Sequence, residues 1–211
     1  MKNVKNIAAL LMALSLVLAA TSHSSAFAEE AEEKVVKISY DKMEGVALEF
    51  EGKAILGEFE VMFDPSNTKM WDNVRLSANS LNGIILKPGE VFSFIKAIGE
   101  ITEKNGYRNA SLLEDGTTEY ADKYAVGIGI VYSATALYNA SLQAHLKVLK
   151  RYDDSTERFL IKDGIKEATV TPERDLEIEN DKEYSILIVI NADKANNSGV
   201  GWCIIKLVQL E

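Results

Sequence analysis

The chain has 211 residues, of which 32 are acidic and 23 are basic, so its formal net charge is −9 at pH 7. Such a surface repels phosphate backbones and anionic lipid, and no stripe of Lys and Arg with interleaved aromatic residues occurs, which argues against nucleic acid as a partner. The single cysteine, Cys203, excludes an internal disulfide bond, so the fold must be stabilised by packing.

Residues 1–28 have the pattern of a secretory signal peptide. Lys2 and Lys5 precede an apolar run at residues 7–20, and residues 26–28 (Ala-Phe-Ala) follow as a small-residue cleavage site. The run of about 14 residues is shorter than the roughly 20 that a spanning helix needs. We therefore expect cleavage after Ala28, a secreted or cell-envelope location and no stable membrane span after cleavage. An uncleaved N-terminal anchor is the alternative.

Residues 29–34 form a short charged stretch that we expect to be a flexible leader, which leaves residues 35–211 for one domain. Apolar residues begin to alternate at residues 35–40. Residues 46–50 and 54–62 continue this period of two on either side of Glu51-Gly52, which predicts a β-hairpin.

The pattern then changes to that of a helix. Asp72 is a candidate N-cap, apolar residues recur at helical spacing, and Gly83 stands where a left-handed residue ends a helix. A turn at Lys87-Pro88-Gly89 leads into a strand predicted at residues 91–94. A second short helix is predicted at residues 97–105.

A longer helix is predicted after the turn at Gly127-Ile128-Gly129. Its apolar residues recur at steps of three and four: Ala134, Leu137, Tyr138, Leu142, Leu146 and Leu149. Runs typical of strands follow at residues 158–161, 167–171, 176–178, 184–190 and 202–210. Because strands and helices do not alternate regularly, we expect a single α+β domain with mostly antiparallel strands around one long central helix plus shorter helices.

Several segments together resemble the VanW-like family, which is named for an accessory protein of B-type vancomycin-resistance clusters. The resemblance is carried by residues 74–83 (VRLSANSLNG), 86–94 (LKPGEVFSF), 106–107 (GY), 137–140 (LYNA) and 168–170 (ATV), and by Asn180 with Tyr184. It spans about residues 56–190. The resemblance implies an exported cell-envelope protein.

The chain departs from this family where chemistry is expected. The family typically has a cysteine at the start of the long helix, where this chain has Val131, and often has histidines just after the helix, where this chain has residues 151–155 (RYDDS). A cysteine at a helix N-terminus is suited to act as a nucleophile, because the helix dipole and the free N–H groups stabilise its thiolate. The family's order of Cys, His and acid along the chain resembles that of papain-type or transglutaminase-type sites. Only the acid remains here, as Glu167.

No other catalytic pattern replaces this set. The chain has no G-x-S-x-G, H-E-x-x-H, P-loop or C-x-x-C motif and no EF-hand spacing, so we expect no catalytic residue, metal or cofactor. We interpret His145 as a mid-helix residue and Cys203 as a core residue. Carboxylate pairs are plentiful in an acidic chain, which leaves a glycosidase-type pair open.

A binding site is the remaining candidate. The N–H groups at the Gly127–Gly129 turn can hold an anionic group, with aromatic walls from Tyr132 and Tyr152. The full candidate set is Gly127, Gly129, Tyr132, Tyr138, Asn139, Tyr152 and Glu167. The alternative is that the glycines only shape the turn and that Tyr138 and Asn139 only pack the helix.

The sequence therefore predicts a non-enzymatic envelope module that binds a cell-wall component or an envelope protein and modulates the cell wall or the glycopeptide response. The alternative is an enzyme that modifies cell-wall peptides or glycans with a relocated active site.

Overall fold

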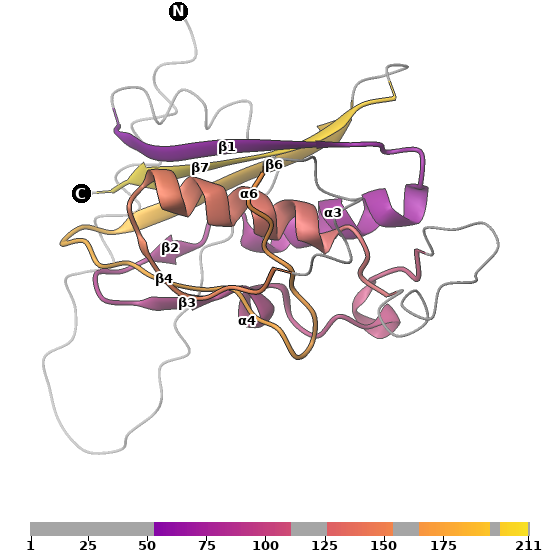
Figure 1. The fold of residues 1–211 in the computed structure, drawn as a ribbon, viewed down its shortest axis with the longest axis horizontal. Coiled ribbons are helices and arrows are strands. Elements are labelled where there is room, and N and C mark those ends of the chain that lie inside the picture. Colours follow the sequence, from indigo (N-terminus) through magenta and orange to yellow (C-terminus); the bar gives the residue numbers. More distant parts are fainter. Residues whose placement is uncertain (1–52, 111–125, 154–164, 195–198, 211) are drawn as a thin grey trace, which may run out of the picture. The chain divides into compact units, whose positions relative to one another are not determined.

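Two antiparallel sheets and two long helices make up most of the computed structural model, which describes residues 53–110, 126–153, 165–194 and 199–210 (Figure 1). The elements are β1 (Ile55–Phe63), α3 (Thr68–Leu81), β2 (Ile85–Leu86), β3 (Val91–Ser93), α4 (Phe94–Ile98), η2 (Glu103–Asn105), α6 (Ile130–Gln143), β4 (Lys147–Lys150), β5 (Glu177–Glu179), β6 (Ile186–Lys194) and β7 (Gly201–Gln209). The predicted α+β fold with mostly antiparallel strands around one central helix is confirmed.

The long helix α6 lies between the two sheets. The larger sheet has the order β1-β7-β6-β2, with α6 packed against β1 and β7 and with α3 packed against β6. The smaller sheet, in the order β3-β5-β4, lies on the other side of α6 (Figure 1). This layering buries both sides of α6.

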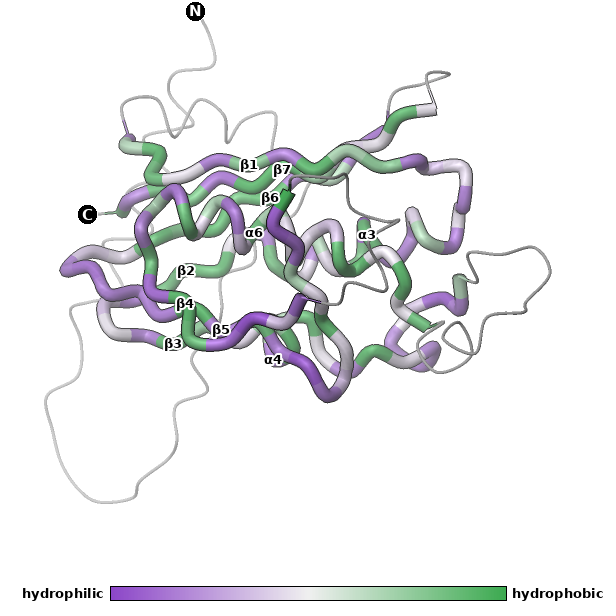
Figure 2. The backbone as a smooth tube through the Cα atoms, viewed as in Figure 1, coloured by the Kyte–Doolittle hydropathy of each residue, from purple (hydrophilic) through white to green (hydrophobic). Residues whose placement is uncertain are grey.

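The alternation of polar and apolar residues along the strands explains which side chains of the larger sheet face the helices. Side chains alternate between two faces of a strand, and Figure 2 shows hydrophilic and hydrophobic residues alternating along β1. On β7, Cys203, Ile205 and Leu207 are buried against the helices. Residues 130–141 of α6 are all buried as well, which matches a helix enclosed on both sides.

The long helix is shorter than the sequence predicts. It ends at Gln143, His145 takes a left-handed conformation with φ 53°, and the chain turns back into β4. Leu146 is buried in the turn, whereas Leu149 is exposed on β4. The predicted helix through Leu149 and the mid-helix place of His145 are therefore wrong, because β4 pairs with β5 and this tertiary pairing overrides a continued helical spacing.

Other helices and strands also begin or end at residues that differ from the predicted ones. The first long helix begins at Thr68 with Asn67 as its N-cap, one turn before Asp72, and the predicted helix at residues 97–105 is split into α4 and η2. Residues 167–171 form no strand; only Thr171 makes an isolated bridge, to Arg174. Local tertiary hydrogen bonds decide these ends, which sequence patterns locate poorly.

Several predictions lie outside the described residues: the signal peptide at 1–28, the leader at 29–34, and the strands at 35–40, 46–50 and 158–161. Within the described ranges, no helix is both long enough and apolar enough to cross a membrane.

Candidate functional site

The turn before α6 is held by the rest of the fold. Gly127 has φ 94° and Gly129 has φ 104°, a conformation that favours glycine. A Cβ atom at Gly129 would lie 2.8 Å from the backbone oxygen of Met70 on α3, and one at Gly127 would overlap the side chain of Ile101. Because these glycines have no side chains, the backbone of the turn can lie directly against α3 and Ile101.

Asn73 fixes the position of this turn. It is fully buried on α3, its Nδ2 donates to the backbone oxygens of Arg108 and Ile128 at 2.9 Å, and its Oδ1 accepts from the Arg108 N–H at 2.7 Å. Two N–H groups at the helix start are also used within the chain, since Ile130 donates to Gly127 O and Tyr132 to Gly129 O. These bonds leave fewer donors for a ligand at this turn.

Tyr132 lies among aromatic core residues. Its ring centroid is 4.7 Å from that of Phe63, which is 5.9 Å from the ring of Trp71. Burial, with a further contribution from the charge of Asp64, raises the pKa of the Tyr132 phenol above its usual value. The phenol therefore stays protonated in the folded protein.

A second group forms where α6 meets the segment at residues 166–169. Asn139 Nδ2 donates to Thr135 O and to Lys166 O, both at 2.8 Å, and Thr135 Oγ1 accepts from the Ala168 N–H at 3.0 Å. The segment consequently runs antiparallel to the helix. Asn139 and Thr135 attach it at two successive turns.

Arg151, just after β4, links the candidate residues of this group. Its guanidinium lies 5.0 Å from the centre of the Tyr138 ring, its Nε donates to Glu167 O at 2.6 Å, and its Nη2 pairs with Asp153 at 2.6 Å. Glu167 is buried, and its Oε1 accepts from the Thr169 hydroxyl at 2.7 Å. A guanidinium held over an aromatic ring by a backbone oxygen and an acidic partner is an arrangement suited to polar recognition.

Tyr152 is the exposed member of the group. The Thr169 N–H donates to its backbone oxygen at 2.9 Å, which places the chain after β4 beside the 166–169 segment. The guanidinium of Arg174 lies 6.0 Å from the Tyr152 ring centre.

The structure thus divides the predicted site in two. Tyr138, Asn139, Tyr152 and Glu167 come together around Arg151, and we call these five residues the Arg151 cluster. Gly127, Gly129 and Tyr132 lie at the start of α6; Gly129 and Tyr138 are nine residues apart, about 13 Å along the helix axis. Arg151 and Arg174 were missed because the sequence does not distinguish them from other arginines.

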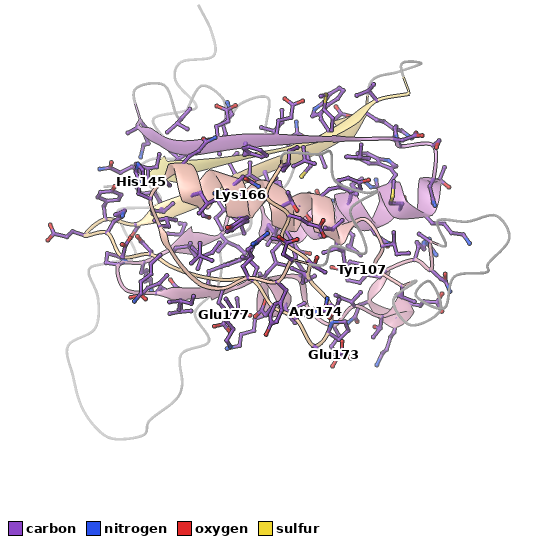
Figure 3. The ribbon with its side chains drawn as sticks, viewed as in Figure 1. Tyr107, His145, Lys166, Glu173, Arg174 and Glu177 are labelled. Carbon is purple, nitrogen blue, oxygen red and sulfur yellow. The ribbon has the colours of Figure 1, made fainter. Side chains whose placement is uncertain are left out.

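The remaining reactive side chains lie elsewhere. Cys203 is fully buried on β7, where burial raises the pKa of its thiol to about 12. His145 is exposed after α6, at the end of the helix away from Arg174 (Figure 3). In the part of the chain that the structure describes, no group of three or more His, Cys, Asp or Glu side chains is arranged to hold a metal ion.

Residues 69–200 match the family described as "VanW like protein", which is more than half of the chain. The chain belongs to the VanW-like family. The resemblance found in the sequence motifs is therefore confirmed.

Two relatives of this VanW-like protein are similar to it over part of their length. It is 29% identical over 150 residues to "Uncharacterized protein YoaR" of Bacillus subtilis (strain 168), covering 71% of this chain and 48% of that protein. It is 26% identical over 129 residues to "Vancomycin B-type resistance protein VanW" of Enterococcus faecalis (strain ATCC 700802 / V583), covering 58% of this chain and 46% of that protein. The chain spans about half the length of both relatives. No solved structure matches it.

The polar residues of the VanW-like motifs have structural partners in this chain. Asn82 Oδ1 accepts from the Ile190 N–H at 3.0 Å, and Asn180 Nδ2 donates to Leu86 O and Tyr184 O at 2.9 Å. These bonds join the end of α3, β2 and β6. They stabilise the fold and do not point to a ligand.

The residue that the sequence motifs align with the family's cysteine, Val131, lies in the first turn of α6. Val131 is one turn before Thr135 and two turns before Asn139, so all three lie on the same face of α6. Thr135 and Asn139 bond to Ala168 and Lys166. The middle of α6, the end of β4 and the segment that contains Glu167 come together through the bonds of Asn139 and Arg151. Val131 is a buried aliphatic residue at this position.

Proposed function

We propose that this VanW-like protein is an exported cell-envelope module that binds a cell-wall component or an envelope protein without catalysing a reaction, and so modulates the cell wall or the glycopeptide response. One observation carries the proposal: Val131, the residue that the sequence motifs align with the family's cysteine, is buried and aliphatic on the face of α6 that also carries Thr135 and Asn139. Valine offers no nucleophile and no proton to transfer, so the side chain at position 131 can shape a binding surface but cannot take part in covalent catalysis.

The Arg151 cluster supports a binding role. Arg151 is tied to Tyr138, Glu167 and Asp153, which fixes the direction of its guanidinium. An ordered Arg next to an exposed Tyr is the kind of pair that recognises polar ligands with little loss of side-chain entropy. A glycopeptide context is proposed from the name of the Enterococcus faecalis relative, a vancomycin B-type resistance protein.

A peptidoglycan pull-down tests binding by the cluster. With protein beginning at Glu29, Tyr152→Ala should lower affinity for purified peptidoglycan by about tenfold or more, which is the size expected for an aromatic contact residue. Leu149→Ala is the matched control because Leu149 is similarly exposed on β4 but lies outside the cluster. Equal retention of both variants and the unchanged protein would contradict the proposed site, and absence of binding by all three would contradict a cell-wall ligand.

The alternative of a wall-modifying enzyme has less support among the described residues. The thiol of Cys203 is fully buried with a raised pKa, and His145 lies on the surface after α6. Cleavage or transfer of wall peptides or glycans by the purified protein would overturn the non-enzymatic proposal. Loss of that activity in Cys203→Ser or His145→Ala would locate the relocated site.

A further inference from the structure

Two exposed arginines lie next to one aspartate of α3. Arg75 is on α3 itself, one turn after Asp72, and Arg108 follows η2. The Nη2 atom of Arg75 lies 3.7 Å from one carboxylate oxygen of Asp72, and the Nε atom of Arg108 lies 3.8 Å from the other. Because both side chains approach the same carboxylate, their guanidinium groups lie close together. We call Arg75 and Arg108 the arginine pair.

The backbone of Arg108 is fixed at this place by hydrogen bonds. Asn73 Nδ2 donates to the Arg108 carbonyl oxygen at 2.9 Å, and Asn73 Oδ1 accepts from the Arg108 N–H at 2.7 Å. The Gly127 N–H donates to the same carbonyl oxygen at 3.1 Å. Asn73 is the neighbour of Asp72 on α3, so these bonds also keep Arg108 beside Asp72 and Arg75. Both arginines therefore project from an ordered backbone, which lowers the entropy cost of binding a ligand.

The two guanidinium groups contribute little to the stability of the fold. The side chains of Arg75 and Arg108 are 61% and 63% exposed. Their distances to Asp72 exceed the roughly 2.7–3.2 Å of an N–H···O hydrogen bond, and exposed ion pairs of this kind stabilise proteins weakly. Arg75 belongs to the VanW-like motif at residues 74–83, but its ion pair is local to α3, whereas Asn82 of the same motif bonds to β6.

We propose that the arginine pair binds an oxyanion, which is a carboxylate or phosphate group of a ligand. The planar fork of N–H donors on each guanidinium matches the oxygens of both groups. Arg75, Arg108 and Asp72 together carry one positive charge, and the other charges of this acidic chain are largely screened beyond about 8–10 Å at physiological salt. The anionic group that the sequence predicts at the Gly127–Gly129 turn is thus held by side chains beside the turn, because the backbone of Arg108 is bonded to Gly127.

Titration with two small anions tests this site. Inorganic phosphate and acetate are added separately, at constant ionic strength, to the protein that begins at Glu29, and the Nε–Hε resonances of Arg75 and Arg108 are followed by ¹⁵N NMR. We expect shifts of both resonances that saturate. Tighter binding of phosphate would identify a phosphate-bearing ligand, and equal or tighter binding of acetate would identify a carboxylate-bearing one. Absence of saturable shifts with either anion would overturn the proposal.

Charge variants at the site have opposite expected effects. Arg75→Gln and Arg108→Gln should each raise the Kd for the anion by about fivefold, because one fork of donors is lost. Asp72→Asn should lower the Kd by about threefold, because it removes the competing carboxylate and keeps the size of the side chain. A higher Kd for Asp72→Asn would contradict the site.

Lys206→Gln is the matched control for the loss of one positive charge. Lys206 is half-exposed in an ion pair with Glu58 and lies on the face of β7 opposite Ile205, away from α3. This variant should change the Kd by less than about twofold. Equal weakening by Lys206→Gln and by the two arginine variants would show a general charge effect and overturn the site. No wall material enters these titrations, so their failure leaves the proposed role of the Arg151 cluster in place.

Discussion

Buried asparagines connect segments that lie far apart in the chain. Asn73, Asn82, Asn139 and Asn180 each bond to backbone groups of another segment. A buried amide without partners costs free energy, so such residues persist where several backbone groups converge on them. The buried asparagines of the VanW-like motifs therefore have a structural role, which is to join segments of the fold.

Cys203 allows a prediction at the same scale. Its thiol should not react with iodoacetamide at about pH 8 until the protein unfolds, because it is fully buried and only the thiolate is the nucleophile. Rapid alkylation of the native protein would show that the core opens at β7 and would restore the thiol as a candidate nucleophile.

The same thiol gives a pH dependence of stability. Burial raises the pKa of Cys203 from 9.0 to about 12, so the unfolded chain loses this proton first as the pH rises. The free energy of unfolding should be unaffected by the thiol below about pH 9 and should fall between about pH 9 and pH 12. Tyr107, whose pKa is also raised to about 12 by burial, contributes to the same decline. Cys203→Ala should therefore show a shallower decline in chemical denaturation, and an identical slope would contradict the assignment.

At the scale of elements, α6 is defined by its neighbours as much as by its own residues. Its apolar spacing continues to Leu149, but the helix ends at Gln143 because the chain turns at His145 and β4 joins β5. Helical spacing and a short strand are hard to distinguish over a few residues.

Two leucines test this boundary. Leu137→Ala should lower the free energy of unfolding by about 2 to 5 kcal/mol, since Leu137 is fully buried on α6 and its removal leaves a cavity. Leu149→Ala should cost less than about 1 kcal/mol, because Leu149 is exposed on β4. Urea denaturation of both variants measures the difference, and similar losses would mean that Leu149 lies in the core as the uninterrupted helix requires.

At the scale of the whole molecule, the larger sheet, the helices and the smaller sheet are stacked closely. Gly57 lies where β1 meets α6, next to the register shift between Ile55 and Gly57. The absence of a side chain lets the strand and the helix backbone approach each other directly.

Gly57→Ala tests this contact between layers. The added methyl group would overlap the backbone oxygen of Ala140, which cannot move aside as a flexible side chain can. We expect a loss of about 3 kcal/mol in the free energy of unfolding, as for an overpacked core position. Glu58→Ala on the same strand removes only an exposed ion pair and should cost less than about 1 kcal/mol in the same thermal or urea denaturation. Equal effects of the two variants would show that β1 does not approach α6 so closely.

The sequence by itself determined the family, the α+β class and the identity of the main helices and strands. The motif at residues 74–83 and the apolar periods at residues 54–62, 184–190 and 202–210 were sufficient for this, because strong periodicity reports burial directly. The motif spacing also predicts that Val131 occupies the family's cysteine position.

The tertiary structure decided where α6 ends and which candidate residues meet. Tyr138, Asn139, Tyr152 and Glu167 lie on three segments, which the bonds of Arg151, Thr135 and Asn139 and the bond from the Thr169 N–H to Tyr152 O bring together. The packing of Tyr132 against Phe63 of β1 and of Gly129 against Met70 of α3 likewise depends on elements that are distant in sequence. Such contacts cannot be read from local patterns, because the partner of a buried group is set by the arrangement of the layers and not by its neighbours along the chain.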